Sequence, residues 1–542
     1  MATSQDPVSA AVAYHQLSKH RLPNRYARSR GYLDWDTQPN PFRLYEGVDR
    51  VALIRDEPGG EDDPTLDQLY DPERVPAAPI DAGSVARLLF DSLAISAWKQ
   101  HGEQRWSLRC NPSSGNLHPT EAHPITGPIT ELCDAPTVWH YTPLLHALER
   151  RARLDSNSWS ALIGDGEGLL VGLSSITWRE AWKYGERAYR YCQHDVGHAI
   201  AALAYSAAAL GWHARMLPRF DDAAVAALVG LDEPKGPEAE HPDLLLFIGP
   251  RMPTRPIDPP RELAIAFSGA PNRLSESHHP WPVNEHVARA CLRAGPVTIA
   301  EPSVPALPEP SPSGASARVL FRTRRSAVAM DGVTTLSRAA WLRMLARTLP
   351  RPGQLPFASL LGRPRVHLLL FVHRVDEVEP GLYLLLRDPG RRESIARSIH
   401  PGFRWTPVAS DGLDLPLYLL EPADTRNAAA LVSCRQAIAA DGAFAVAMLA
   451  ELEPTLREHG AWMYRHLHWE AGAIGQVLYL EAEAAGRRAT GIGCFFDDAV
   501  DELLGLGDRS LASLYHFTVG GPVHDPRLQT LDAYHHLEWT PS

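Results

Sequence analysis

The chain has 542 residues, 44% of them hydrophobic and 22% charged, and a formal net charge of −11. Such a length predicts about two to four domains instead of one core. The net negative charge argues against a nucleic-acid-binding surface or a basic membrane-binding patch. No apolar run approaches the roughly 18 residues of a bilayer span, and the first residues lack a signal-peptide pattern. We therefore expect a cytoplasmic protein without nucleic-acid or membrane partners.

The six cysteines are far apart in the sequence and form no CxxC pair. This spacing favours reduced thiols over a disulfide framework or a zinc site. His194 and His198 lie four residues apart, as two metal ligands on a helix would, but no third or fourth ligand is evident. We expect core or interface histidines here and no metal site. A single cysteine, Cys494, stands near one of the glycine-rich motifs and by itself predicts no thiol mechanism.

The elements are predicted in chain order. A polar, turn-rich extension with several aromatic residues covers residues 1–75 and is expected to pack onto the rest of the chain. Periodicity predicts a helix over Val85–Trp98 and short strands over Val138–Tyr141 and Leu244–Gly249. A proline-rich run between Gly295 and Ser316 predicts an extended linker. We therefore expect a first domain over 76–260, a linker over 261–317 and a second domain over 318–542.

A diverged internal repeat joins the two halves. Tyr189–Gly211 and Tyr464–Gly486 align without a gap at an offset of 275 residues, since 464 minus 189 and 486 minus 211 both give 275. Both copies open with Tyr-Arg, continue with an acidic residue and a glycine, and end in an alanine-rich stretch closed by glycine, as a helix C-cap would be. Small residues on a long helix allow a second helix to approach closely. The repeat predicts two copies of one fold, in effect a fused dimer.

Four short motifs carry candidate chemistry. Arg109–Pro124 contains a tight loop of small donors that would suit a backbone lying against a flat polar ring, although an ordinary turn has the same pattern. Arg324, Arg325 and Ser326 precede a helical pattern at Ser337–Leu345 and could bind a phosphate, or form a solvated basic turn. The remaining two motifs are the glycine-rich turn Gly491, Ile492 and Gly493 and the terminal Arg527, a second phosphate candidate.

Together these motifs resemble the FMN-dependent nitroreductase fold. The run Pro112–Pro119 resembles its proline-serine-asparagine loop, Arg324–Ser326 its phosphate-binding segment, and the glycine turn and the run Val519–Leu528 its later flavin segments. The run Trp182–Gly211, with the N-terminal extension, looks like the SagB/ThcOx branch, the azoline dehydrogenases of ribosomal-peptide biosynthesis. The resemblance covers most of the chain outside the linker.

The resemblance implies an α+β fold, an antiparallel sheet flanked by helices in each of two nitroreductase-like domains that form an intrachain pseudodimer. It implies FMN between the halves, with the loop of one copy and the phosphate residues of the other. The implied cofactor-binding residues are Pro112, Ser113, Ser114, Gly115, Asn116, His118, Arg324, Arg325, Ser326, Gly491, Ile492, Gly493 and Arg527. Because these motifs are not duplicated, we expect one complete site and one degenerate site per chain.

Lys183 and Tyr184 match the place of a Lys-Tyr pair implicated in catalysis in the azoline dehydrogenases. Either could take a proton from carbon as hydride leaves, whereas a solvated lysine beside a packed tyrosine would look the same in sequence. The resemblance implies an oxidoreductase that dehydrogenates a C–N or C–C bond in a peptide-derived substrate, with a cyclase or another biosynthetic enzyme as a partner. An NAD(P)H-dependent reductase of nitro compounds, quinones or enones, and a non-catalytic flavin-binding scaffold, remain open alternatives.

Overall fold

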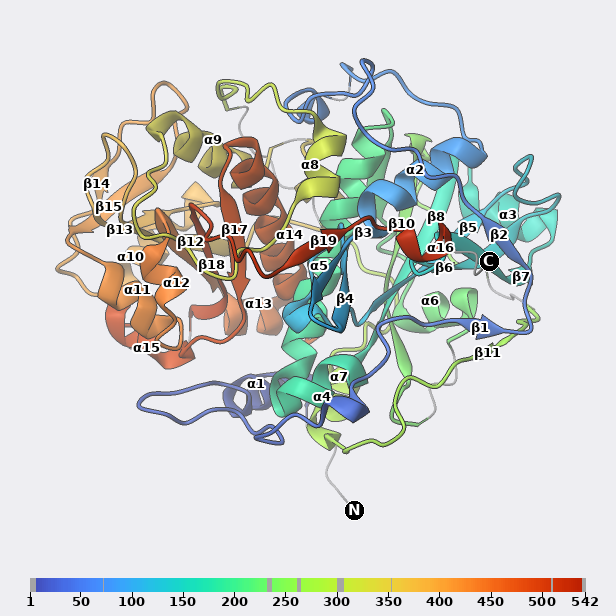
Figure 1. The fold of residues 1–542 in the computed structure, drawn as a ribbon. Coiled ribbons are helices and arrows are strands. Elements are labelled where there is room, and N and C mark those ends of the chain that lie inside the picture. Colours follow the sequence, from blue (N-terminus) through green and yellow to red (C-terminus); the bar gives the residue numbers. More distant parts are fainter. Residues whose placement is uncertain are drawn as a thin grey trace.

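The computed structural model describes residues 6–71, 73–231, 236–260, 265–299, 307–351, 353–507 and 510–538. Figure 1 shows these residues as two halves side by side, with the first half on the right and the second on the left. Each half is built around a sheet of seven strands, and neighbouring strands within both sheets are antiparallel. The α+β architecture expected from the sequence is therefore confirmed.

The two sheets share the topology of six of their seven strands. In the first, the order is β2 (Arg50–Ala52), β7 (Ala147–Arg153), β6 (Thr137–Thr142), β5 (Thr120–Thr126), β8 (Glu167–Ile176), β10 (Glu240–Arg251) and β9 (His213–Met216). In the second, it is β14 (Thr406–Pro407), β15 (Leu417–Pro422), β13 (Gly381–Leu385), β12 (Val366–Val372), β16 (Phe444–Ala450), β18 (Ala512–Gly520) and β17 (Arg488–Ile492). Apart from the edge strands β2 and β14, which come from different points of the two copies, the same chain order of six strands fills the same positions, and this identifies the halves as copies of one fold.

The central strands are buried on both faces of their sheets. Strand β12 is apolar nearly throughout, and its side chains alternate between two cores. Leu368 and Leu370 pack in the core that also contains the long helix Met463–Ala484. Leu369 and Phe371 pack in a separate core on the opposite face of the sheet. A continuous apolar run, instead of an alternating one, is what a strand covered on both faces requires.

Helices cover these faces. In the first half they are α2 (Ala82–Ser92), α3 (Ser156–Ile163), α4 (Thr177–Tyr184), α5 (Ala188–Ala208), α6 (Asp222–Val229) and α7 (Pro282–Ala290). In the second they are α8 (Ala317–Thr323), α9 (Arg338–Thr348), α10 (Arg392–Ser398), α11 (Arg426–Val432), α12 (Ala437–Asp441), α13 (Leu452–His459), α14 (Met463–Ala484) and α15 (Asp497–Leu504). Ser337 caps α9, with its hydroxyl accepting the Ala340 N–H at 3.3 Å, so the predicted helix is confirmed.

The helix predicted over Val85–Trp98 is too long. It ends at Ser92, and Ile95–His101 forms strand β3, which pairs with β4 (Gln104–Arg109). Up to Ser92 the apolar residues have helical spacing. Beyond Ser92, the pairing of β3 with β4 in a hairpin makes the chain extended. Periodicity alone does not separate these two short apolar segments.

Helices α5 and α14 are the two repeat segments, and they cross at the centre of the molecule (Figure 1). A Cβ on Gly197 would lie 2.3 Å from the Trp469 carbonyl oxygen, and one on Gly472 would lie 2.3 Å from the His194 carbonyl oxygen. The two contacts are equivalent, because 469 minus 194 and 472 minus 197 both equal 275. The repeated glycine is therefore the point of closest helix approach, in an interface with the reciprocal pattern of a two-fold dimer.

The repeated arginine also joins the halves reciprocally. Arg190 of the first half donates to Asp497 of the second at 2.8 Å, and Arg465 of the second half donates to Asp222 of the first at 2.6 Å. Asp222 and Asp497 are the first residues of α6 and α15 and are again 275 positions apart. These side chains are buried, so each cross-half ion pair must be complete to be tolerated.

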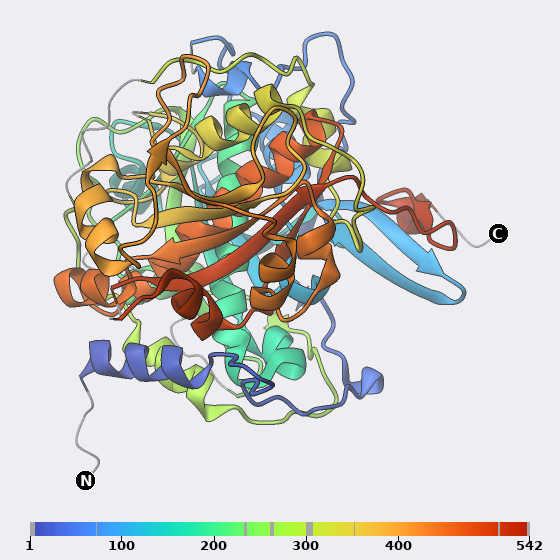
Figure 2. The same ribbon diagram turned by 90° about the vertical axis from the view of Figure 1, so that its left-hand side faces the viewer.

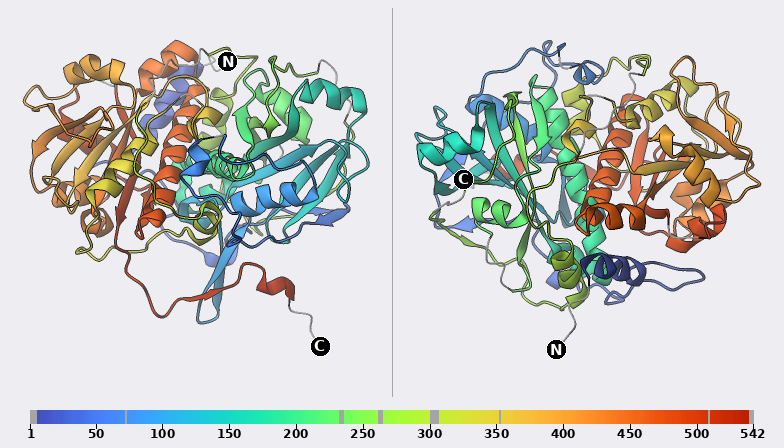
Figure 3. Two further views of the ribbon diagram at one scale, coloured as in Figure 1. Left: turned by 90° about the horizontal axis from the view of Figure 1, so that it is seen from above. Right: turned by 180° about the vertical axis from the view of Figure 1, so that it is seen from behind.

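Each half sends a terminal arm onto the other. Near the N-terminus, α1 (Pro7–Leu17) places Tyr14 against the ring of Tyr464. Near the C-terminus, β19 (Gln529–Leu531) adds to β3, and the Trp98 indole donates to the Ala533 carbonyl at 2.9 Å, just before α16 (His535–Glu538). Figures 2 and 3 show the β3–β4 hairpin projecting from the body together with this C-terminal segment.

The remaining segments lie around this body. Residues 261–317, expected as a linker, include β11 (Ala270–Pro271), which pairs with β1 (Tyr45–Glu46), and α7. Residues 300–306 of the proline-rich run are outside the described ranges. Among the helices of the described residues, none has the length and apolarity that a bilayer crossing requires.

Candidate functional site

A cavity of about 730 Å³ lies where the two halves meet. The first half contributes the loop at 111–118, the end of α4 and one face of α5, and the second half contributes residues 324–328, strand β17 and the start of the C-terminal arm. The β3–β4 hairpin covers one side through Lys99, Trp106 and Leu108. The volume of the cavity is in the range of small-molecule and cofactor sites.

The loop at one wall of the cavity is held in a strained conformation. Gly115, Asn116 and His118 have φ angles of 59°, 61° and 52°, in the left-handed region that only glycine adopts easily. A non-glycine residue held there costs on the order of 1–3 kcal/mol, and such residues concentrate at functional sites. The Ser113 hydroxyl accepts the His118 N–H at 2.8 Å and thereby closes the loop.

Helix α5 anchors this loop through Asp195, the acidic residue of the first repeat. The Ser114 N–H and hydroxyl each donate to the Asp195 carboxylate at 3.0 Å. Burial raises the pKa of Asp195 to about 7, although the hydrogen bonds from Ser113 and Ser114 oppose the shift. The repeat and the loop thus form one structural unit.

Part of the cavity wall is strongly cationic. Lys99, Arg324, Arg325 and Arg488 all line it. Within the described ranges, no carboxylate forms an ion pair with Arg324 or Arg325, whose guanidinium groups donate to backbone carbonyls. Burial and the neighbouring Arg324 lower the pKa of Arg325 to about 10. Arg488 does have an anionic partner, because it pairs with Glu483 at 2.7 Å. The unpaired positive charge of Arg324 and Arg325 is the electrostatic signature of an anion-binding site.

Lys183 and Tyr184 approach the loop from the end of α4. A Cβ on Gly115 would lie 2.4 Å from the Tyr184 hydroxyl oxygen and 3.1 Å from Lys183 Nζ, so both side chains lie directly against the loop. Tyr184 lines the cavity. Burial lowers the pKa of Lys183, an effect that Glu180 opposes, and burial raises the pKa of Tyr184 well above its usual range.

The glycine turn makes room for two tyrosines. A Cβ on Gly491 would lie 2.1 Å from the Tyr515 hydroxyl oxygen, and one on Gly493 would lie 2.2 Å from Tyr191 Cε1. The Tyr191 hydroxyl donates to the Gly493 carbonyl at 3.0 Å and so links α5 to β17. The sequence suggested that these glycines admit a ligand; in the structure, the nearest atoms to their missing side chains belong to tyrosines of the cavity wall.

The structure brings most of the sequence-predicted residues together. The cavity is lined by Pro112, Ser113, Ser114, Gly115, Asn116, His118, Tyr184, Arg324, Arg325, Ser326, Gly491, Ile492 and Gly493. Lys183 lies behind Gly115 and is not part of the lining. Arg527 is not brought to the cavity: its side chain is 74% exposed and pairs with Asp525 at 2.7 Å within the same turn.

Several lining residues were missed by the sequence reasoning. Tyr191, Asp195 and His198 are on one face of α5, spaced by four and three residues, and this spacing within the repeat was an available signal. Arg488 stands three residues before Gly491 in a motif already noted. Lys99 had no such signal, because only the folded hairpin carries it to the cavity.

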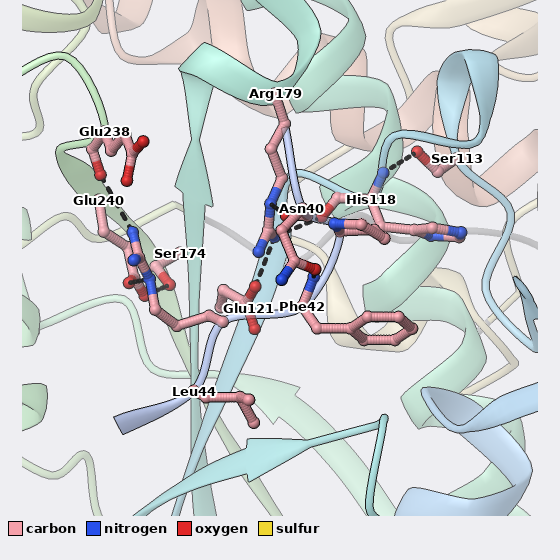
Figure 4. Close-up of polar contacts among 12 residues, drawn as sticks. Asn40, Phe42, Leu44, Ser113, His118, Glu121, Ser174, Arg179, Glu238 and Glu240 are labelled. Atoms are coloured by element: carbon pink, nitrogen blue, oxygen red, sulfur yellow. Dashed lines mark hydrogen bonds and ion pairs between the residues drawn. The ribbon is translucent and has the colours of Figure 1, made fainter. Parts of the chain in front are cut away.

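Beneath the loop, a buried network ties the N-terminal extension to the site (Figure 4). Arg179 donates to the His118 carbonyl at 2.7 Å and to the Asn40 carbonyl at 3.1 Å, and it pairs with Glu121. Glu121 also contacts His140 at 3.1 Å and points away from the loop into the first half. Glu121 therefore supports the loop from below.

A second, smaller cavity of about 130 Å³ occupies the pseudo-equivalent position. Its lining includes His466 and Glu470, which correspond to Tyr191 and Asp195 at the offset of 275. Glu470 accepts the Arg365 N–H at 3.1 Å, as Asp195 holds the loop of the first half. It also pairs with Arg387, whose guanidinium lies 4.4 Å from the ring centre of Phe357.

The duplicated antiparallel sheet, the crossed central helices and a cavity between the copies define a nitroreductase fold. A crystal structure from Anabaena variabilis ATCC 29413, titled provisionally as a nitroreductase, is similar over 95% of this chain and 99% of its own, with a TM-score of 0.69 and 21% identity. This similarity establishes the fold over nearly the whole chain.

Residues 391–521 match the Nitroreductase family. A Methanocaldococcus jannaschii protein, also named provisionally as a nitroreductase, is 29% identical over 82 residues, which are 15% of this chain and 41% of that protein. The chain thus matches less than half the length of this curated relative. One chain of the Escherichia coli microcin synthetase McbBCD complex is similar over 42% of this chain and 79% of its own, with a TM-score of 0.28 and 17% identity.

Proposed function

We propose that this protein is an FMN-dependent oxidoreductase that dehydrogenates a C–N or C–C bond, of the azoline-to-azole type, in a peptide-derived substrate. The observation that carries the proposal is the cavity itself, which is lined by Arg324 and Arg325, without ion-pair partners among the described residues, and is bordered by the Lys183–Tyr184 pair. The match of residues 391–521 to the Nitroreductase family supports oxidoreductase chemistry.

The residues present fit FMN. Among the described residues, Arg324 Nη1, Asn111 Oδ1 and His118 Nδ1 are buried and have no hydrogen-bond partner. All three residues line the cavity, so a polar ligand would satisfy groups that are otherwise costly to bury. Arg324, Arg325 and Ser326 would hold the phosphate, and the loop at 112–118 would face the ring system across the cavity.

The two candidate bases differ in their electrostatics. A general base must lose its proton near neutral pH, and burial moves the pKa of Lys183 down toward that range. Burial moves the pKa of Tyr184 in the opposite direction, so a tyrosinate is disfavoured. We therefore assign the base to Lys183 and a hydrogen-bonding role to Tyr184.

Glu180 is a buried carboxyl whose charge acts on Lys183. Burial, with the nearby Asp195, raises the pKa of Glu180 well above its usual range, and both of its oxygens lack partners among the described residues. When bound, FMN supplies the acceptor for the hydride that leaves the substrate. Neutral Lys183 would take the proton from the substrate carbon, and the charge of an ionised Glu180 would favour the resulting ammonium.

Two other functions make different predictions. A reductase would accept hydride from NAD(P)H, and the fold alone does not separate the two directions because one fold hosts several chemistries. A non-catalytic scaffold would need no space beside the loop, whereas this cavity is lined by Tyr184 and extends to the β3–β4 hairpin. The cavity therefore favours an enzyme over a scaffold. A peptide substrate and a cyclase or another biosynthetic partner remain part of the proposal.

The first experiment is to purify the protein, record its visible spectrum and count the flavin released per chain. We expect one FMN per chain, and a protein without FMN, even after its addition, would overturn the proposal. Anaerobic mixing with NADPH then decides the direction. Slow or absent bleaching, together with oxidation of azoline-containing peptides, supports the dehydrogenase, whereas rapid bleaching favours the reductase.

A further inference from the structure

Two cysteines that are distant in sequence meet beside the proposed flavin site. Cys434 follows α11, and Cys494 follows β17 and lines the cavity. Two hydrogen bonds tie their segments together: the Phe496 N–H donates to the Val432 carbonyl at 2.8 Å, and Gln436 Nε2 donates to the Cys494 carbonyl at 2.9 Å. These contacts bring the segments of Cys434 and Cys494 together, and each thiol shifts the pKa of the other.

The backbone at Cys434 is strained in a way that suits this contact. Cys434 and Arg435 have φ angles of 54° and 59°, two consecutive left-handed residues that are not glycine. Each such residue costs on the order of 1–3 kcal/mol and tends to be retained where function requires the geometry. Here the conformation holds the Cys434 thiol beside Cys494.

The surrounding charges polarise the pair. His20 Nδ1 accepts the Ala27 N–H at 2.9 Å, so the other ring nitrogen carries the proton. Burial lowers the pKa of His20, and the nearby Cys494 opposes that effect. The nearby Cys434 lowers the pKa of the Cys494 thiol, and His20 and Arg187 lower it further against the effect of burial. Cys494 in turn raises the pKa of Cys434. A thiolate beside a thiol is the reactive arrangement for disulfide chemistry.

The other buried cysteines have a different environment. Cys110, Cys192 and Cys291 are buried, and burial raises the pKa of each thiol, as expected for inert core residues. Cys434 and Cys494 are only partly buried. The pair is thus set apart from these three by accessibility and by its charged neighbours.

We propose that Cys434 and Cys494 form a redox-active dithiol–disulfide couple that exchanges two electrons with the flavin of the adjoining cavity. This inference rests on the proposed function. Closing the S–S bond joins the Cys494 thiolate to the Cys434 thiol, and it releases two electrons and the Cys434 proton. The two electrons and the proton together convert one oxidised flavin to its two-electron-reduced anion. In the reverse direction, the reduced flavin returns the electrons and the proton, and the S–S bond breaks.

The first test determines whether the couple forms. The holoenzyme is equilibrated in glutathione buffers of graded potential, its free thiols are alkylated, and its peptides are mapped by mass spectrometry. We expect a reversible loss of two thiols and a linked peptide that joins Cys434 to Cys494. C434S should abolish the linkage. C133S is the matched control and should keep the linkage, because Cys133 is also partly buried but forms its hydrogen bonds with Thr126 and Gly127. No linked peptide at any potential would overturn the proposal.

The second test determines whether the couple exchanges electrons with the flavin. In an anaerobic dithionite titration, the oxidised wild type and C133S should take up four electrons per chain before full reduction, and C434S should take up two. Two electrons in the wild type would overturn the proposal while leaving the FMN-dependent function intact. A linked peptide in a protein that retains no FMN would instead overturn the electron exchange and the proposed function together.

Discussion

Replacing Arg325 with alanine tests the cationic end of the cavity. Its guanidinium donates to the carbonyls of Arg322, Arg324 and Ser96 at 2.7–3.0 Å, and it has no carboxylate partner among the described residues. In the proposed complex it would form a charge-assisted hydrogen bond to the FMN phosphate. Such a bond contributes about 1.5–3 kcal/mol, so Arg325→Ala should raise the Kd for FMN about 10-fold to 150-fold.

The assay is titration of the apoprotein with FMN and, separately, with riboflavin, each followed by quenching of flavin fluorescence. Because riboflavin lacks the phosphate, its Kd should be the same for the wild type and Arg325→Ala. Arg527→Ala is the matched control, since Arg527 was an equal candidate in the sequence but is exposed and paired with Asp525. An unchanged FMN Kd in Arg325→Ala would refute the phosphate assignment, as would equal weakening for riboflavin.

Four further outcomes follow from the geometry. Lys183→Ala should retain FMN but lose turnover by about 10²-fold to 10⁴-fold, and wild-type turnover would exclude Lys183 as the base. Gly472→Ala should lower the free energy of unfolding in urea by about 3 kcal/mol, because the added Cβ would meet backbone atoms 2.3 Å and 2.9 Å away. Gly60→Ala is the control: open space surrounds Gly60, so the free energy of unfolding should change by less than about 0.5 kcal/mol. Arg465→Ala leaves a buried carboxylate unpaired and should cost about 3–5 kcal/mol in the same assay, and a smaller loss would show that the cross-half pair is dispensable. Alkylation of Cys494 should reach its plateau rate well below the pH of about 8.5 at which an ordinary thiol is half ionised, and Cys434→Ser should shift this profile upward; an ordinary profile in the wild type would contradict the lowered pKa.

The repeat was the part of the fold that the sequence predicted best. Arg190 and Arg465, and Gly197 and Gly472, are the residues that make the reciprocal contacts between the halves. Selection for two equivalent contacts explains why they persist while most of the helix has diverged. A further signal was overlooked: Phe-Asp-Asp-Ala occurs at 220–223 and again at 496–499, and each run includes an aspartate that receives one of these arginines.

The site was predicted as separate motifs but not as an assembly. The loop near Ser114 and the arginines near Arg324 are more than 200 positions apart, and only the pairing of the halves brings them to one cavity. Arg527 looked equivalent to Arg325 in sequence, yet a carboxylate two residues away binds its guanidinium. Cys494 was set aside as a lone thiol because nothing in the sequence places Cys434 beside it. These are all long-range contacts, which periodicity and local composition do not encode.

The two equivalent positions at the interface differ in what occupies them. The larger cavity, at about 730 Å³, contains Arg324 and Arg325, which form no ion pair with the described residues, whereas the smaller one, at about 130 Å³, contains Arg387 paired with Glu470. Ligand sites usually measure about 300–1,000 Å³, so the smaller cavity is too small for a flavin. Its arginine also supplies the charge that balances Glu470, whereas Asp195 at the equivalent position receives only hydrogen bonds from the loop. A homodimer must keep both sites alike, because one sequence builds both. A fused pair is free to fill one site with its own side chains, so we expect one FMN per chain.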